Sequence, residues 1–141
     1  MKRLASIDIG TQTIRLLIAD CNDNGEIKPI HRDRQIIRLG SGMNLNQTLS
    51  EKNIKNAINC ISSFKNIADK YKAEKIFAAS TACVREASNS NYFIESVYNE
   101  TGITPDILSG EQEALLSLKG VQSVTRGNDY SLVIDMGGGS T

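Results

Sequence analysis

The stretch A-S-I-D-I-G-T-Q-T-I-R-L-L-I-A-D, residues 5–20, decides the fold. It holds two apolar runs, residues 3–9 and 13–20, which are rich in isoleucine and leucine and are separated by a short polar turn. Such runs, bounded by glycine and hydroxyl residues, are typical of β-strands. A turn cluster at 22–25 then leads to a third run with rough alternation, 26–38. Three strands in succession predict an antiparallel meander at one edge of a sheet.

Helices and strands alternate in the rest of the chain. Ser50 and Ser109 are good helix N-caps, and Gln112 stands where a capping box needs it. The polar stretch 39–49 is a predicted loop. This order predicts an α/β fold in which helices flank a mixed sheet. The predicted helices are residues 51–71, 91–100 and 109–124, and the predicted strands are 75–79, 104–108 and 130–136.

A strand that ends in Asp-x-Gly occurs twice, in residues 5–11 and 132–138, with Asp8 and Asp135 separated by 127 positions. Glycine lets the backbone turn sharply and approach a ligand, and successive N–H groups can then bind phosphate oxygens. Two matched copies indicate two related lobes that face each other. Hydroxyl groups beside the glycines would add donors, from Thr11, Thr13, Ser140 and Thr141.

The two aspartates require a counter-ion if both loops bind one phosphate. Converging carboxylates would repel the anion, and Mg²⁺ prefers oxygen ligands of this kind. The repeat therefore predicts a divalent metal and a phosphate together. The alternative is that Asp and Gly serve ordinary turn chemistry. The three glycines 137–139 argue against it, because a simple turn does not require their entropic cost.

Several charged residues could take part in chemistry, but the residues alone leave their roles open. Glu111 and Glu113 lie in the first turn of a predicted helix, where the helix dipole already favours acidic side chains. Arg85 fits either a surface ion pair or a phosphate contact. Arg38 could point toward a cleft or toward water. A functional role is harder to dismiss for Arg15, because this arginine interrupts an apolar strand pattern.

Composition excludes several classes of function. The chain has 141 residues with 16 basic and 16 acidic side chains, so no overall field attracts nucleic acid or a lipid surface. One histidine and no G-x-S-x-G rule out a Ser-His-Asp hydrolase, and no P-loop motif is present. The three cysteines lack metal-site spacing and fit buried, reduced side chains. We therefore expect a cytoplasmic protein that partners neither nucleic acid nor membrane.

Five motifs together resemble the N-terminal region of the exopolyphosphatase and guanosine pentaphosphate phosphohydrolase (Ppx/GppA) family, within the superfamily of actin, sugar kinases and chaperone ATPases. They are I-D-I-G-T-Q-T-I-R-L from residue 7, R-L-G-S-G from 38, A-S-T-A-C-V-R-E-A-S-N from 79, L-S-G-E-Q-E-A from 108 and V-I-D-M-G-G-G-S-T from 133. The resemblance implies a ribonuclease H-like actin-fold lobe with a five-stranded mixed sheet in residues 1–124. Residues 125–141 would begin a second, truncated lobe.

The resemblance also implies site roles. Glu113 matches the proposed catalytic base, which decides against Glu111, and Arg85 matches an arginine that contacts phosphate. Gln12 and Gln112 depart from the family's usual asparagine and glutamate, which leaves substrate preference open. The implied metal-site residues are Asp8, Asp135 and Glu113. The implied phosphate-binding residues are Gly10, Thr11, Gln12, Thr13, Arg38, Gly137, Gly138, Gly139, Ser140 and Thr141.

The expected function is metal-assisted hydrolysis that releases terminal orthophosphate from polyphosphate or guanosine pentaphosphate. Two alternatives stay open at this point: a phosphotransferase of the same superfamily, acting from ATP on a sugar or small acid, and a non-catalytic sensor of a phosphorylated ligand. Because half of the expected cleft is missing, we expect the chain alone to be inactive. The residues do not decide whether the full-length protein forms a homodimer, and this possibility stays open.

Overall fold

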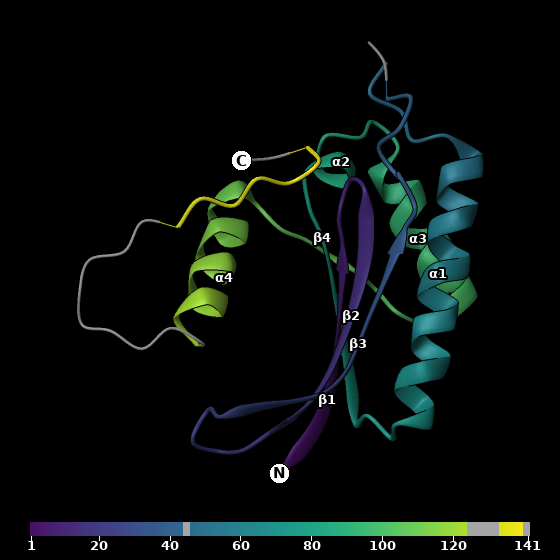
Figure 1. The fold of residues 1–141 in the computed structure, drawn as a ribbon. Coiled ribbons are helices and arrows are strands. Elements are labelled where there is room, and N and C mark those ends of the chain that lie inside the picture. The colour runs from purple at the N-terminus through teal and green to yellow at the C-terminus, as the bar shows by residue number, and fades with distance from the viewer. Residues whose placement is uncertain (44–45, 124–132, 140–141) are drawn as a thin grey trace.

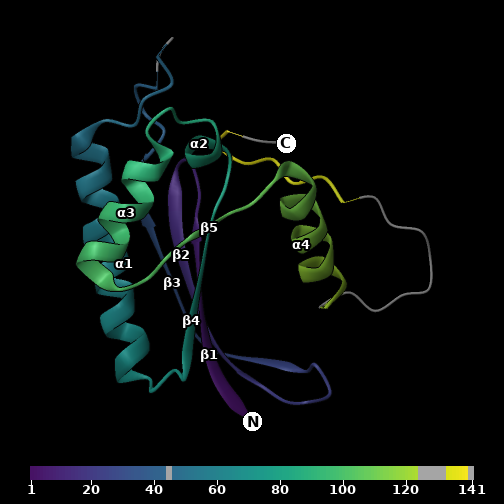
Figure 2. The same ribbon diagram turned by 180° about the vertical axis from the view of Figure 1, so that it is seen from behind.

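A five-stranded mixed sheet with the strand order β3-β2-β1-β4-β5 forms the centre of the protein (Figures 1 and 2). The computed structural model describes residues 1–43, 46–123 and 133–139. The mixed sheet and its flanking helices agree with the predicted α/β fold. The elements are β1 (Lys2–Ile9), β2 (Thr13–Cys21), β3 (Ile27–Ile36), α1 (Glu51–Lys70), β4 (Lys75–Ser80), α2 (Ala82–Arg85), α3 (Ser90–Thr101), β5 (Asp106–Ile107) and α4 (Gly110–Gln122).

The predicted meander is confirmed, because β1 pairs with β2 and β2 pairs with β3, both in antiparallel register. The chain then crosses over through α1, and β4 runs parallel to β1 on its other side. Parallel strands end at the same edge of a sheet, and here Ile9 of β1 lies opposite Ser80 of β4. The loops that follow these two strands therefore emerge side by side.

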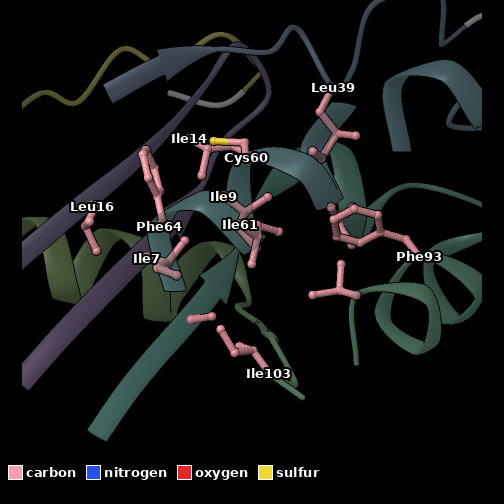
Figure 3. Packing of buried hydrophobic residues seen from close by; sticks show 14 of the residues in the cluster. Ile7, Ile9, Ile14, Leu16, Leu39, Cys60, Ile61, Phe64, Phe93 and Ile103 are labelled. Carbon is pink, nitrogen blue, oxygen red and sulfur yellow. The ribbon is translucent and has the colours of Figure 1, made fainter. Parts of the chain in front are cut away.

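Helices α1 and α3 cover one face of the sheet, and α4 lies on the opposite side (Figures 1 and 2). Ser50 caps α1 as predicted, and its side chain accepts a hydrogen bond from the Asn53 N–H. Phe64 and Phe93, from α1 and α3, are fully buried in one core with the sheet side chains Ile7 and Ile9 (Figure 3). Burying a side chain of this size contributes about 1.5–3 kcal/mol, so this layer stabilises the lobe.

Helix α4 differs from the other long helices because none of its side chains is buried. Its N-terminus has the predicted capping box, in which Ser109 and Gln112 each bond the other's backbone N–H at 3.2 and 2.9 Å. Leu115 and Leu116 are about half exposed. Within the described residues, no helix is long and apolar enough to cross a bilayer.

One prediction about secondary structure was wrong, and one short helix was missed. Residues 133–136 were predicted as the main part of a strand, but they pair with no strand within the described part of the chain. An extended segment without a ladder partner is not a β-strand, whatever its propensity. The four residues of α2 were not predicted as a helix, because they follow a small-residue turn and are too short for a periodic pattern.

Some predictions fall outside the described residues. They are the lobe boundary at 124–125, the start of the last predicted strand at 130–132, and the hydroxyl residues Ser140 and Thr141. The division into two lobes therefore stays a prediction.

Candidate functional site

A cavity of about 500 Å³ lies where the ends of β1 and β4, the first turns of α4 and the C-terminal segment meet. Most of the predicted site residues line it, although they come from distant parts of the sequence. The predicted residues in its wall are Asp8, Gly10, Thr11, Gln12, Thr13, Glu113, Asp135, Gly137, Gly138 and Gly139. The structure therefore places both Asp-x-Gly segments around one space.

The first loop, residues 10–13, is fixed by its own backbone and by residues 37–40. The Gly10 N–H donates to the Thr13 carbonyl at 3.0 Å, which closes the turn. The carbonyls of Thr11 and Gln12 accept three further hydrogen bonds from N–H groups of residues 37–40, at 2.9 to 3.1 Å. These two carbonyls are thus directed toward the segment that follows β3, which suits a loop whose N–H groups are to bind an anion.

Arg38 has a position that the sequence did not indicate. Its N–H donates to the Gln12 carbonyl at 2.9 Å, its φ of 56° is left-handed, and its side chain is exposed rather than part of the cavity wall. Gly40 follows closely, where an added Cβ would lie 2.6 Å from Thr11 Cγ2 and 3.2 Å from Cys83 Cβ. The R-L-G segment therefore supports the first loop through backbone contacts.

The two glycine loops touch each other. A Cβ on Gly138 would overlap the side chain of Gln12, and one on Gly139 would lie 2.5 Å from Thr11 Oγ1. Such contacts are possible only because these positions lack a side chain. The glycines of the second loop thus allow it to lie directly against the first.

The carboxylates at the cavity are held by specific partners. Asp8 Oδ2 accepts from Arg15 Nη1 at 3.1 Å, and Asp135 Oδ2 accepts from Ser117 Oγ at 2.6 Å. Burial raises the pKa of Asp8 above its ordinary value; Arg15 opposes the rise, while the charges of Glu113 and Asp135 add to it. The charges of Glu113 and Asp135 therefore reach the Asp8 carboxylate.

This electrostatic coupling fits a divalent cation near Asp8 and Asp135. Burial is the main cause of the raised Asp8 pKa, and a positive ion near this carboxylate would offset both burial and the smaller repulsion from Glu113 and Asp135. Among the side chains that the structure describes, no three His, Cys, Asp or Glu residues form a complete ligand cluster. Mg²⁺ does not require one, because it keeps several waters and takes one or two protein carboxylates.

Arg85 connects the end of β4 to the start of α4. The short helix α2 directs its side chain so that Nη1 donates to the Leu108 carbonyl at 2.8 Å and lies 3.3 Å from Glu113 Oε2. Both charged side chains are mostly buried, with 28% and 23% exposed. Glu111 is exposed and does not line the cavity, so the structure separates the two glutamates.

Nine of the described residues in the cavity wall were not predicted as site residues, and four of these are polar: Ser6, Arg15, Thr81 and Ser117. Thr81 follows β4 and reaches the cavity because β4 is parallel to β1. Ser117 lies four residues after Glu113, a spacing that places both on one face of a helix and could have indicated its position. Arg15 also lines the wall, opposite Asp8 in the β1–β2 register.

The Asp8 carboxyl should titrate above the ordinary aspartate value of 3.8 in the metal-free chain. Folding raises the pKa of Asp8, so protonation of this carboxyl stabilises the folded state at low pH. This contribution to folding stability is lost as the pH rises through the raised pKa. Removing the Arg15 charge in Arg15→Gln should raise the pKa further. Carboxyl ¹³C NMR against pH tests both shifts, and a titration at or below 3.8 in the unsubstituted chain would contradict the first.

Two curated proteins are similar to this chain in sequence over nearly its whole length. The chain is 42% identical to a bifunctional 3-dehydroquinate synthase/phosphatase of Fusobacterium nucleatum, over 97% of this chain and 22% of that protein. It is 32% identical to a guanosine-5'-triphosphate,3'-diphosphate pyrophosphatase of Aliivibrio fischeri, over 97% of this chain and 27% of the relative. The chain therefore spans about a quarter of the length of these curated relatives.

Solved structures show the same lobe. A Ppx/GppA family member of Aquifex aeolicus superposes with a TM-score of 0.80 at 31% identity, over 86% of this chain and 40% of that one. An exopolyphosphatase of Cytophaga hutchinsonii superposes with a TM-score of 0.85 at 27% identity, over 92% of this chain and 41% of that one. The model of the Ppx/GppA phosphatase family matches residues 17–141. With most of its length matched in this way, the chain belongs to the Ppx/GppA phosphatase family.

Proposed function

We propose that the intact protein carrying this chain releases terminal orthophosphate from inorganic polyphosphate or guanosine pentaphosphate. The observation that supports this most is the contact between the two glycine loops, with Glu113 in the wall of the same cavity. Glycine-rich backbone and hydroxyl groups form an anion site, and a carboxylate beside it can activate water. The reaction class is hydrolysis of a phosphoric anhydride.

In this mechanism the loops bind the terminal phosphoryl group before reaction. N–H groups and hydroxyls of residues 10–13 and 137–141 would bind its oxygens. Glu113 would orient a water molecule in line with the bond to be broken and accept its proton. Mg²⁺, bound near Asp8 and Asp135, would supply positive charge for the phosphate oxygens. Positioning and electrostatics would then account for most of the rate.

Arg85 has two parts in this proposal. Its contacts with Glu113 and the Leu108 carbonyl hold the first turn of α4 against the end of the sheet. Its positive charge also lies beside the carboxylate that would accept the proton, where it can balance charge on a bound phosphate. The arginine therefore both positions the base and adds to the electrostatic field at the cavity.

The substrate is proposed at the level of the phosphoanhydride bond. Among the similar proteins, one is named a guanosine-5'-triphosphate,3'-diphosphate pyrophosphatase, one an exopolyphosphatase, and one a bifunctional synthase/phosphatase. Both substrates present a terminal phosphoryl group to the same kind of loop. A cytoplasmic location belongs to the proposal, because the three cysteines are unpaired.

Phosphate release by the intact protein tests the proposal. Orthophosphate should appear from polyphosphate, from guanosine pentaphosphate or from both, and chelation of Mg²⁺ should stop it. Residues 1–141 alone should remain near background in the same assay. Release from neither substrate would contradict the proposal. Transfer from ATP to a sugar or small acid would indicate a phosphotransferase, and tight binding without turnover would indicate a sensor.

A further inference from the structure

A second hollow, of about 660 Å³, adjoins the cavity on the face of the sheet opposite α1. We call it the arginine groove. It shares Ser6, Asp8 and Arg15 with the cavity wall, so the two spaces are neighbours. The residues that line it are Ser6, Asp8, Arg15, Leu16, Leu17, Arg32, Asp33 and Arg34, all from β1, β2 and β3.

The sheet register places the arginines in the groove. Asp8, Arg15 and Arg34 are opposite one another across β1, β2 and β3, and in a parallel row Leu17 lies opposite Arg32. Like charges directly opposite each other destabilise a sheet. Arg15 is compensated on one side by Asp8, at 3.1 Å. The Arg15–Arg34 juxtaposition therefore has a cost that an anion bound between the two would remove.

The side chains of Arg32 and Arg34 are exposed beside the groove. In the described part of the chain neither makes an ion pair within 4.0 Å. Asp33 lies between them in sequence and opposite Leu16 in the register, and its Oδ1 accepts from the Arg34 backbone N–H at 2.6 Å. Its charge also reaches the α1 side of the sheet. There, burial raises the pKa of the Cys60 thiol to about 12, and Asp33 adds to the rise. Among the described residues, the groove thus presents two exposed guanidinium groups that are in no ion pair.

We propose that the arginine groove binds the non-reacting phosphates of a condensed phosphate chain whose terminal phosphate occupies the cavity. This inference rests on the proposed function and adds a path for the rest of the substrate. Guanidinium groups bind phosphate oxygens through paired N–H donors, and repeated phosphates match repeated arginines. With a net charge of zero for the whole chain, such a polyanion is held by this local arrangement.

A guanine base fits the groove less well than phosphates do. Arginine can donate to guanine O6 and N7, but full recognition of the ring edge also needs an acceptor for its N1–H and N2–H groups. The Asp8 carboxylate is paired with Arg15, and Asp33 Oδ1 already accepts from the Arg34 backbone N–H. The remaining polar side chains of the groove are Ser6 and the arginines. The chemistry therefore favours a chain of phosphates over a nucleoside.

The double variant Arg32→Gln/Arg34→Gln of the intact protein tests this inference. Its KM for long-chain polyphosphate should rise about tenfold, because each exposed arginine–phosphate contact contributes a few-fold in affinity. The KM for tripolyphosphate, which is too short to extend far beyond the cavity, should change by less than about twofold on the same reasoning. The matched control, Lys52→Gln/Lys55→Gln, removes the same charge from the exposed side of α1 and should leave both values close to wild type.

A binding measurement separates this inference from the proposed function. In a Glu113→Gln background, affinity for long-chain polyphosphate should fall about tenfold with the arginine substitutions and not with the lysine control. If wild type hydrolyses neither substrate, the proposed function fails, but the binding comparison still decides the groove. Equal losses in both double variants, or a loss confined to guanosine pentaphosphate, would overturn the inference. So would single-stranded RNA that binds more tightly than polyphosphate and depends on the same arginines.

Discussion

Replacing Glu113 by glutamine should lower phosphate release by the intact protein about a thousandfold, since general base catalysis contributes about 10²–10⁴ in rate. Glutamine keeps the size of the side chain and can still contact Arg85, but it cannot accept a proton from water. The substrate should bind with affinity close to that of wild type. Steady-state phosphate release together with equilibrium binding of a non-hydrolysed analogue measures the two effects separately.

Glu111→Gln is the matched control for this experiment. It removes the same charge from the same turn of α4, but Glu111 is exposed and lies outside the cavity wall. Its turnover should stay within about twofold of wild type, as is usual for surface substitutions away from a site. Near-normal turnover in Glu113→Gln, or an equal loss in Glu111→Gln, would remove Glu113 from the role of base.

The fold was predictable where local signals are strong. The meander follows from two apolar runs, a turn cluster and a third run with rough alternation, and helices α1 and α4 each begin at a serine cap that the sequence shows. These features depend on residues a few positions apart, such as Ser109 and Gln112. The pairing of β4 with β1 follows from the crossover through α1 and needs only the order of elements.

The features that the sequence did not show depend on distant neighbours. Residues 133–136 have the composition of a strand but find no ladder partner among the described residues. Arg38 was expected to be a phosphate-binding side chain, and its position could not be seen from its neighbours in sequence. Its backbone N–H contacts the carbonyl of Gln12, a residue of the earlier β1–β2 turn. Side-chain identity does not reveal such a contact.

The candidate site could be predicted in part from the sequence. The repeated Asp-x-Gly pattern indicated which residues should converge, and most of them line one cavity. The pattern could not show how the carboxylates would be held, because Ser117 and Arg15 reach Asp135 and Asp8 through helix and strand geometry. A repeat in sequence predicts that two loops are related, and only the packing of the sheet and α4 determines what lies between them.

Gly139→Ala should lower the kcat/KM of the intact protein about a hundredfold, because misplacing a reacting group by about 1 Å can cost that much. The added Cβ would lie 2.5 Å from Thr11 Oγ1 and 3.3 Å from Thr11 Cβ, so the two loops must separate. Gly139 has no left-handed φ, and alanine is therefore compatible with its backbone. The effect should come from the loop contact alone, and the melting temperature should hardly change.

Two companion variants make this result decisive. Gly120→Ala adds the same methyl group to α4 at an exposed position with nothing within 4 Å, and it should stabilise the helix by about 0.5–1 kcal/mol without lowering turnover. Thr11→Gly combined with Gly139→Ala removes the clash, and NMR contacts between positions 11 and 139 in the chain 1–141 should then show the two loops together again. If Gly139→Ala alone keeps wild-type turnover, the loops do not close on a shared phosphate, because a side chain between them would then be harmless. A hundredfold loss that Gly120→Ala does not share would locate the chemistry at the contact between the two loops.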